Sequence, residues 1–524
     1  MVKKLLLYII ITLFVIGCSH KEEVPHLDTS KTLREEIIEH RTEKIVLSKG
    51  FQSTEPMVEA TNEGGKLKLI VRAGVMECSG ISIDKVTKSG DTITLYISGL
   101  FEKDKMQLAI PQASIIIEEP INNNINNLNF KIVSQNYKPI ALKYNKNQII
   151  DKIRGEFKID INTMPQVELI KHGDNIHWNM VFFNLVHKEK DRYPLSNLKV
   201  KADALTGEIL DYEKNTISTY IDEGYIMDYL PNKLILYKKT HVDNNIQYES
   251  LWTYDIESQH RTKIYTTKLN IQNAYFNPEG KYISLIEKDD TKSDIYIIEV
   301  SKNIAYKITS PEHFNPKLIK WKNNDELSIA NINNTRTTIL TYDVNENRLS
   351  KEFEMDKIIN SFDILENMII FSEADELAMN KNIYLTMDGI SLKEIGEGFN
   401  PSFFDDKNII YLNNDESVNK NKLIIYSIER NSIMNKLDYN IISYNKLNDD
   451  TLTFIENSSF TNEYNFIKYD INNRTVISAY RINSPNLFYN SEDEKAYLSL
   501  TISGKDKNIN NIYCIDLNEV SIAK

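Results

Sequence analysis

The stretch Asn277-Pro278-Glu279-Gly280-Lys281-Tyr282-Ile283, followed by Asp294-Ile295-Tyr296-Ile297, decides the fold that we expect for most of this chain. The first part joins a turn containing proline and glycine to the beginning of an apolar strand. The second part is another short apolar strand. Short apolar runs bounded by turn residues are typical of antiparallel β-structure. The stretch therefore predicts two neighbouring strands joined by a polar turn.

The same pattern recurs from about Asp222 to the C-terminus. The separations between successive first strands are 48, 45, 41, 41, 43 and 44 residues. A second apolar strand follows each first strand, as in Leu251–Ile256, Ile339–Val344 and Ile512–Leu517. A period of about 40 to 45 residues with several short strands is typical of β-propeller blades. The first strands are expected to begin at Lys233, Lys281, Glu326, Asn367, Asn408, Thr451 and Lys495.

We expect a propeller over residues 216–524, and the repeats favour seven blades. Six blades follow if 222–267 is a connecting pair of hairpins, and an irregular pair of β-sandwiches is the alternative to any propeller. The segment Asn277–Ile283 with Asp294–Ile297 resembles the blade motif of TolB-type propellers. Asn315-Pro316 and Asn400-Pro401 are degenerate copies of its beginning, and no Trp-Asp dipeptide of the WD40 type occurs.

Residues 141–215 have a different pattern. Asn145 to Phe157 places isoleucines at helical spacing, and three strands are expected to follow, at Val167–Ile170, Trp178–Val186 and Leu198–Leu210. The last contains the sequence D-A-x-T-G-E from Asp203 to Glu208, in which aspartate, threonine and glycine suit a tight turn. This order of elements and this motif resemble the PepSY domain of exported bacterial proteins. The resemblance implies a small α+β domain without catalytic residues.

Residues 45–140 are expected to form a small antiparallel β domain, because Lys66–Val71 and Asp91–Ile97 alternate with period two. Ser89-Gly90-Asp91 is expected to be a hairpin turn. Ahead of this domain, the spacing of Thr32 to Glu35 and of the following apolar residues predicts a short helix over Leu33 to Arg41. Residues 18–44 would then be a tether ending in that helix.

The first 17 residues are expected to be a secretory signal peptide. A basic start is followed by the uncharged run Leu5–Ile16, which is shorter than the roughly 20 residues needed to span a bilayer as a helix. Val15-Ile16-Gly17-Cys18 resembles the lipobox of bacterial lipoproteins. The resemblance implies cleavage between Gly17 and Cys18 and lipid on Cys18. The expected location is the extracytoplasmic face of the cell membrane, held by palmitate and related acyl chains.

Composition restricts the partners. The net charge is −12, and it becomes −14 when a signal peptide carrying Lys3 and Lys4 is removed. An acidic chain of this kind is not suited to nucleic acid or to electrostatic docking on anionic lipid. Cys78 and Cys514 fall in different expected domains without a C-x-x-C motif, so we expect two buried thiols rather than a disulfide or a zinc site.

No catalytic motif was found. The sequence lacks G-x-S-x-G, H-E-x-x-H and the glycine-rich phosphate loops, and its last histidine is His313. His172, His177 and His187 form a cluster that we interpret as ordinary strand histidines, with a metal site as the less favoured alternative. Acidic groups recur between strands, and we interpret them as solvated hairpin tips rather than Ca²⁺ loops. They are Glu287, Asp289, Asp290 and Asp294, then Asp415 and Glu416, then Asp449 and Asp450.

The sequence thus favours a non-catalytic envelope lipoprotein whose propeller binds a protein or peptide, with no metal, no cofactor and a binding site left unassigned. The expected partner is an envelope or secreted protein. The alternative is an extracellular hydrolase or lyase acting on glycan in the propeller channel. Hydrolysis of that kind would need two carboxylates converging on one cleft.

Overall fold

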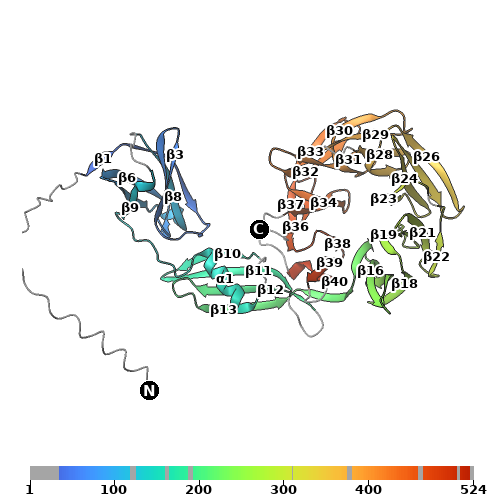
Figure 1. Cartoon of the computed structure of the whole chain (residues 1–524), viewed down its shortest axis with the longest axis horizontal. Helices are drawn as coiled ribbons and strands as arrows, with labels where there is room; N and C mark the ends of the chain where they lie inside the picture. Colours follow the sequence, from blue (N-terminus) through green and yellow to red (C-terminus); the bar gives the residue numbers. More distant parts are fainter. Residues whose placement is uncertain are drawn as a thin grey trace, which may run out of the picture. The chain divides into compact units, whose positions relative to one another are not determined.

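A computed structural model describes most of the chain, and its secondary structure is mainly β (Figure 1). It separates into two compact units, one within Met1–Lys146 and one within Asn147–Lys524. No helix in the described part is long and apolar enough to cross a membrane. The described residues are 35–118, 125–159, 164–186, 193–309, 311–374, 380–457, 464–503 and 508–519.

The first unit consists of two sheets that enclose a hydrophobic core containing Leu69, Ile93 and Ile115. Its strands are antiparallel except for β7 and β9, which pair in parallel, so the expectation of a purely antiparallel domain was wrong at that pair. The predicted turn at Gly90 is confirmed, with φ +60° between β6 and β7. One sheet contains β1 (Glu36–Ile38), β6 (Gly80–Ser89), β7 (Thr92–Leu100) and β9 (Asn129–Ser134). The other contains β2 (His40–Ser48), β8 (Gln107–Ile117), β4 (Lys66–Arg72) and β3 (Met57–Glu63), with β5 (Met76–Cys78) paired to β8.

The helix expected over Leu33 to Arg41 is wrong for its described part, where the strands β1 and β2 stand instead. A helical stripe would bury Ile37 and Ile38 together, but Ile37 is 73% exposed and Ile38 is 4% exposed, as in a strand. Glu35 does not close a capping box either, because its carboxylate accepts hydrogen bonds from Thr87 and Tyr96 on the neighbouring strands. Pairing with β6 decides this segment, and the β domain therefore begins before residue 45.

The second unit begins with the helix and strands expected at 141–215. The helix α1 (Lys146–Phe157) buries Ile149, Ile150 and Ile153, as its spacing predicted. The turn at 203–208 also has the predicted bonds: the Asp203 carboxylate accepts from the amides of Leu205 and Thr206, and Gly207 has φ +73°. The antiparallel sheet has the order β10 (Gln166–His172), β11 (Asn175–Val186), β12 (Leu195–Asp203) and β13 (Ile209–Thr216).

The remaining strands form successive small antiparallel sheets that follow one another around a ring, the arrangement of a β-propeller (Figure 1). All seven predicted first strands are present, each beginning within one residue of its expected position. The first three sheets are β15 (Tyr225–Leu230), β16 (Leu234–Asp243), β17 (Ile246–Asp255) and β18 (Arg261–Thr267); β19 (Asn270–Phe276), β20 (Tyr282–Lys288), β21 (Ser293–Glu299) and β22 (Ile304–Lys307); and β23 (Phe314–Trp321), β24 (Glu326–Asn333), β25 (Arg336–Asp343) and β26 (Arg348–Met355).

The next sheet has seven strands because one strand serves two repeats. The strand β30 (Lys393–Phe403) pairs with β29 through its first half and with β31 through its second half. Gly398 permits this close crossing, since an added Cβ would lie 2.3 Å from the Leu412 carbonyl oxygen. The other strands are β27 (Ile359–Leu365), β28 (Met368–Glu373), β29 (Lys381–Thr386), β31 (Asn408–Asp415), β32 (Lys420–Ser427) and β33 (Ser432–Leu437). A four-stranded sheet follows, with β34 (Ile441–Lys446), β35 (Thr451–Asn457), β36 (Tyr464–Asp470) and β37 (Thr475–Ile482).

The last sheet combines both ends of the repeat region. The strand β14 (Ser218–Glu223), which precedes all the repeats, pairs with β40 (Asn508–Asp516) near the C-terminus. The sheet is completed by β39 (Lys495–Ser503) and β38 (Leu487–Asn490). Only Ile217 separates β13 from β14, so the α+β sheet continues directly into the strand that joins the two ends.

Asparagine explains many of the hairpins. Asn244 and Asn245 have φ values of +49° and +62° between β16 and β17, the conformation of a tight hairpin turn. Asn334 and Asn419 also have positive φ in later hairpins. Asparagine tolerates this left-handed region better than other side chains, which allows a glycine-poor chain to make so many turns.

A disulfide across the closing strands tests the pairing of β14. Thr219 and Cys514 are direct cross-strand partners, and such pairs lie within the Cα separation that a disulfide requires. We expect Thr219→Cys to form a bond with Cys514 on oxidation and to raise the Tm, because a loop holding almost the whole propeller is closed, worth up to about 5 kcal/mol by chain entropy. Thiol trapping and thermal melting with and without reductant measure this. Thr219→Cys combined with Cys514→Ser is the control, and failure of the single variant to cross-link would contradict the pairing.

Candidate functional site

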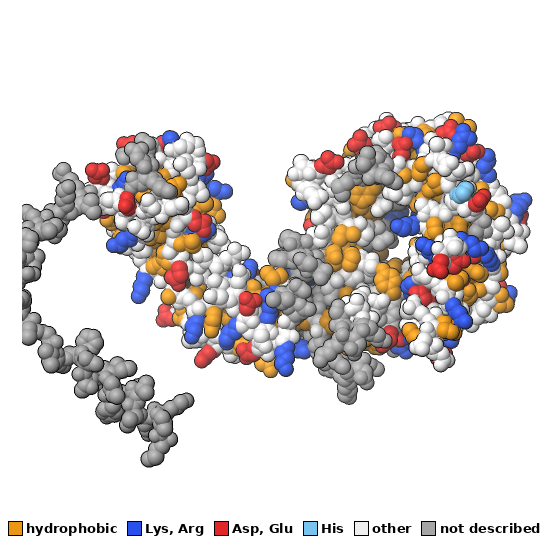
Figure 2. Space-filling view, in the orientation of Figure 1, with side chains coloured by type: hydrophobic (Ala, Val, Ile, Leu, Met, Phe, Trp, Pro, Cys, Tyr) orange, Lys and Arg blue, Asp and Glu red, His pale blue; other side chains and the backbone are white. Residues whose placement is uncertain are grey.

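The innermost strands of neighbouring sheets line a pocket of about 680 Å³. Figure 2 shows hydrophobic and basic side chains around a hollow inside the ring of sheets. The lining is mostly aromatic and aliphatic, with a small number of polar groups, which is the usual character of a ligand-binding pocket. The side chains that matter below are Asp228 and Tyr229 from β15, Tyr275 and Phe276 from β19, Lys317, Lys320 and Trp321 from β23, and Ser361 and Phe362 from β27.

Asp228 is the carboxylate in the described lining of this pocket. Its Oδ2 accepts a hydrogen bond of 2.7 Å from the amide of Phe276, one sheet further around the ring. Burial raises the pKa of Asp228 from 3.8 to about 6, and the amides of Phe276 and Tyr229 offset only part of that effect. A carboxylate with this environment is an ionised acceptor at neutral pH that is held in a poorly solvated place.

Asp363 occupies the corresponding place on β27 but has a cationic partner. Its Oδ2 accepts from the amide of Phe403 at 2.9 Å, and Lys320 on β23 donates to Oδ1 at 2.5 Å. The Lys320–Asp363 pair therefore joins two neighbouring innermost strands. Lys317, which is exposed, forms no ion pair among the described residues.

Aromatic side chains also join neighbouring sheets at this level. The Trp321 indole donates to the Tyr275 carbonyl at 3.1 Å, and the buried Tyr444 hydroxyl donates to the carbonyls of Asn400 and Ile410. Burial raises the pKa of Tyr444 above its ordinary range, so this hydroxyl remains a donor. These bonds fix the walls of the pocket before any ligand binds.

A second hollow, of about 550 Å³, is lined mainly by charged and polar side chains that include Glu249, Lys268 and Lys288. Glu249 is already engaged, since it accepts from Lys238 and from the Ile271 amide. It contains none of the aromatic rings of the first pocket. The first pocket is therefore the better candidate for a binding site.

The site residues predicted at the N-terminus, Gly17 and Cys18, lie outside the described residues. His187 does too. His172 and His177 lie near each other, with ring centroids 5.9 Å apart, and burial together with Lys201 and His172 lowers the pKa of His177. No group of three or more His, Cys, Asp or Glu side chains suited to a metal was found in the part of the chain that the structure describes. Cys78 and Cys514 are free thiols.

The acidic clusters have two different explanations. Glu287 is 2% exposed on β20, so its interpretation as a solvated hairpin tip was wrong. Asp289 does lie in a turn, where amides of Thr291 and Lys292 hold the pKa of its carboxyl at about 2. The others have basic or polar partners: Asp294 contacts Lys307, Asp415 contacts Lys422, Asp449 contacts Lys446, and Asp450 accepts from Asn472.

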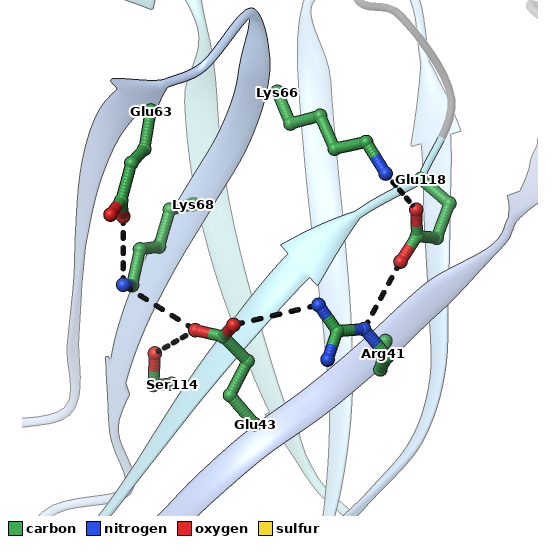
Figure 3. Close-up of polar contacts among 7 residues, drawn as sticks. All are labelled: Arg41, Glu43, Glu63, Lys66, Lys68, Ser114 and Glu118. Atoms are coloured by element: carbon green, nitrogen blue, oxygen red, sulfur yellow. Dashed lines mark hydrogen bonds and ion pairs between the residues drawn. The ribbon is translucent and has the colours of Figure 1, made fainter.

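The first unit carries a connected set of charges on the sheet that contains β2, β4 and β8 (Figure 3). Arg41 contacts both Glu43 and Glu118, and Glu118 also accepts from Lys66. Lys68 joins Glu43 to Glu63 at 3.4 and 2.7 Å. These groups are solvated and mutually neutralised, so they contribute little to stability and present no excess charge for a ligand.

No protein-family model matches the sequence, and no curated protein matches it either. Three solved structures are similar in fold. TolB from Acinetobacter baumannii is 13% identical, with 76% of this chain and 95% of that chain covered and a TM-score of 0.34. Oligogalacturonate lyase from Vibrio parahaemolyticus is 9% identical, with 67% and 97% covered and a TM-score of 0.41. The β-propeller domain of the Trilobed protease from Pyrococcus furiosus is 12% identical, with 62% and 94% covered and a TM-score of 0.33.

These neighbours carry different activities in their names, so any chemistry proposed for this chain has to come from its own residues. The chain has the β-propeller fold on the basis of its sheet order and repeat spacing. The sequence did not reveal Asp228 or Trp321 as pocket residues, because the lining comes from four separate repeats. Their shared place in the repeat was the available signal.

The pH dependence of stability tests the environment of Asp228. Its folded pKa, about 6, lies above the unfolded value of 3.8, so the folded state binds the proton more tightly and the group lowers stability as pH rises between these values. Asp228→Asn does not titrate. We expect the stability of the wild type relative to this variant to fall by up to about 3 kcal/mol between pH 3.5 and pH 7.5. Denaturant unfolding of both proteins measures the difference, and a pH-independent difference would contradict the assignment.

Proposed function

We propose that this chain is a non-catalytic cell-envelope lipoprotein, attached through lipid on Cys18, whose propeller binds a protein or peptide. The observation that carries the proposal is the pocket on the innermost strands, where Trp321, Phe362 and Tyr275 offer apolar surface beside a few polar groups. A volume of about 680 Å³ suits several amino-acid side chains of a bound segment. The partner would be an envelope or secreted protein.

The propeller of this proposal has seven blades. Six of them begin with the predicted strands at β16, β20, β24, β28, β31 and β35, and the seventh is the sheet of β38, β39, β40 and β14. The strand β30 is counted in two blades, as the outermost strand of one and the innermost strand of the next. A ring closed by strands from both ends of the repeat region holds the pocket walls in fixed positions.

The α+β sheet supports a positioning role within the same proposal. Leu195 and Ile217 belong to the core of the last sheet, and the Tyr513 hydroxyl donates to the Tyr193 carbonyl at 2.5 Å. Asn184 also donates to the Arg481 carbonyl at 3.2 Å. We propose that this PepSY-like domain holds the propeller at a fixed attitude, and that it has no catalytic role of its own.

The residues favour binding over glycan hydrolysis at this pocket. Hydrolysis of that kind uses two carboxyl groups about 5 to 10 Å apart on either side of the scissile bond. The described lining supplies Asp228, whereas the neighbouring Asp363 is committed to Lys320 and to the Phe403 amide.

Lipid attachment is tested by metabolic labelling with a palmitate analogue. We expect the wild type to take up the label and to begin at Cys18 by mass spectrometry of the mature chain. Cys18→Ser is expected to take up no label, because the thiol that accepts the diacylglycerol is absent. Cys78→Ser and Cys514→Ser serve as matched controls that keep the label. Labelling of the Cys18→Ser variant would contradict the proposal.

Partner binding at the pocket is tested by affinity capture from cross-linked intact cells. Lys317→Glu reverses the charge of an exposed pocket side chain, and Lys436→Glu makes the same change on β33, outside the pocket. We expect the wild type and Lys436→Glu to recover the same specific partner and Lys317→Glu to recover at least ten-fold less. Equal recovery by both variants would place the partner elsewhere, and recovery of no specific partner by any of the three would contradict the proposed function.

A further inference from the structure

We propose that the Asp228 carboxylate is the receptor for a cationic side chain, lysine or arginine, carried by an otherwise apolar peptide segment that occupies the pocket. This inference rests on the proposed function and specifies its ligand. It comes from comparing two repeats of the propeller that share one internal arrangement but complete it differently.

Asp228 and Asp363 hold the same place in their repeats. Asp228 pairs with Leu236 and Asp363 pairs with Ile370, and both partners are three residues beyond the predicted strand starts at Lys233 and Asn367. Each carboxylate accepts a hydrogen bond from the backbone of the next innermost strand, Asp228 at 2.7 Å and Asp363 at 2.9 Å. The two groups therefore serve as equivalent links between neighbouring sheets.

The cationic partner is present in one repeat and missing in the other. Lys320, on the strand that precedes Asp363 in the ring, pairs with Ser328 across its sheet. The equivalent residue preceding Asp228 is Phe488, which pairs with Tyr497 and whose ring lies 5.9 Å from that of Tyr229. A phenylalanine thus stands where a lysine neutralises Asp363. Among the described residues no lysine or arginine forms an ion pair with Asp228.

The carboxylate of Asp228 has capacity for another donor. An ionised carboxylate offers about four acceptor positions, and the amides of Phe276 and Tyr229 use two of them. A partly buried charge that lacks a counter-charge is costly, so a ligand that supplies the counter-charge recovers that free energy on binding. The Lys320–Asp363 contact of 2.5 Å shows that this site geometry accepts an ammonium group.

The remaining pocket groups are compatible with a cation at Asp228. Lys320 is neutralised by Asp363, and Lys317 on the same strand is the like charge that the ligand must keep away from. Tyr229 and Tyr275 add aromatic rings, whose faces attract cations. The chain as a whole is acidic, with a net charge of −12, which favours the approach of a basic ligand over long range.

Three capped peptides test the proposal on the mature full-length chain by isothermal titration calorimetry: acetyl-Phe-Lys-Phe-amide, its norleucine analogue and its glutamate analogue. We expect the lysine peptide to bind at least ten-fold more tightly than the norleucine peptide, and the glutamate peptide to bind most weakly. Butylamine, which carries the ammonium without the peptide, is expected to bind at least ten-fold more weakly than the lysine peptide, because it leaves the aromatic walls uncovered.

Three variants locate the effect. Asp228→Asn is expected to remove the preference for lysine, and Phe488→Lys to remove it by supplying the ammonium from within the chain. Glu416→Gln, which removes a negative charge from the turn between β31 and β32, is expected to keep the preference. Melting of each variant verifies its folding. Peptide binding without a lysine preference, or a preference that survives both Asp228→Asn and Phe488→Lys, would overturn this inference alone. If no peptide binds, the inference fails together with peptide binding at the pocket.

Discussion

The pairing of β14 with β40 is the constraint on which the rest of the second unit depends. Propeller sheets pack mainly against their neighbours, so an open ring would leave its first and last sheets with apolar faces uncovered. The last sheet takes one strand from before the repeats and three from their end, which makes ring closure part of a sheet rather than a separate contact. Backbone hydrogen bonds then hold the ends together, and a core that includes Ile482, Leu498 and Tyr513 supports them.

Ring closure also determines how the pocket is built. The innermost strands contribute few residues each, and bonds between sheets, such as those of Asp228, Trp321 and Tyr444, set their spacing. A carboxylate is an effective link because it can accept from one backbone amide and from a side chain together. At Asp363 the second donor is Lys320, and at Asp228 the ring of Phe488 leaves that role open. The same structural device is thus complete at one place and available to a ligand at the other.

The sequence predicted much of the fold because repetition multiplies a weak local signal. A single strand beginning at Glu326 or Thr451 is ambiguous, but seven starts at similar spacing are not, and each was found within one residue. The turn at Asp203 was predictable because its bonds are local. The segment at Ile37 and Ile38 was mispredicted because pairing with β6, remote in sequence, overrides a helical pattern. Glu287 failed for a similar reason, since burial depends on neighbouring sheets. Pocket residues gave no local pattern at all.

Site-specific photo-cross-linking tests most directly whether the pocket is where a partner binds. A photoreactive phenylalanine derivative would replace Lys317 in the pocket, with the same replacement at Lys436 on β33 as the reference, in intact cells. The account predicts one specific peptide-containing adduct from position 317, whose cross-linked segment contains a lysine or arginine, and no such adduct from position 436. Adducts from position 436 alone, or the same adduct from both positions, would contradict a binding site inside the ring.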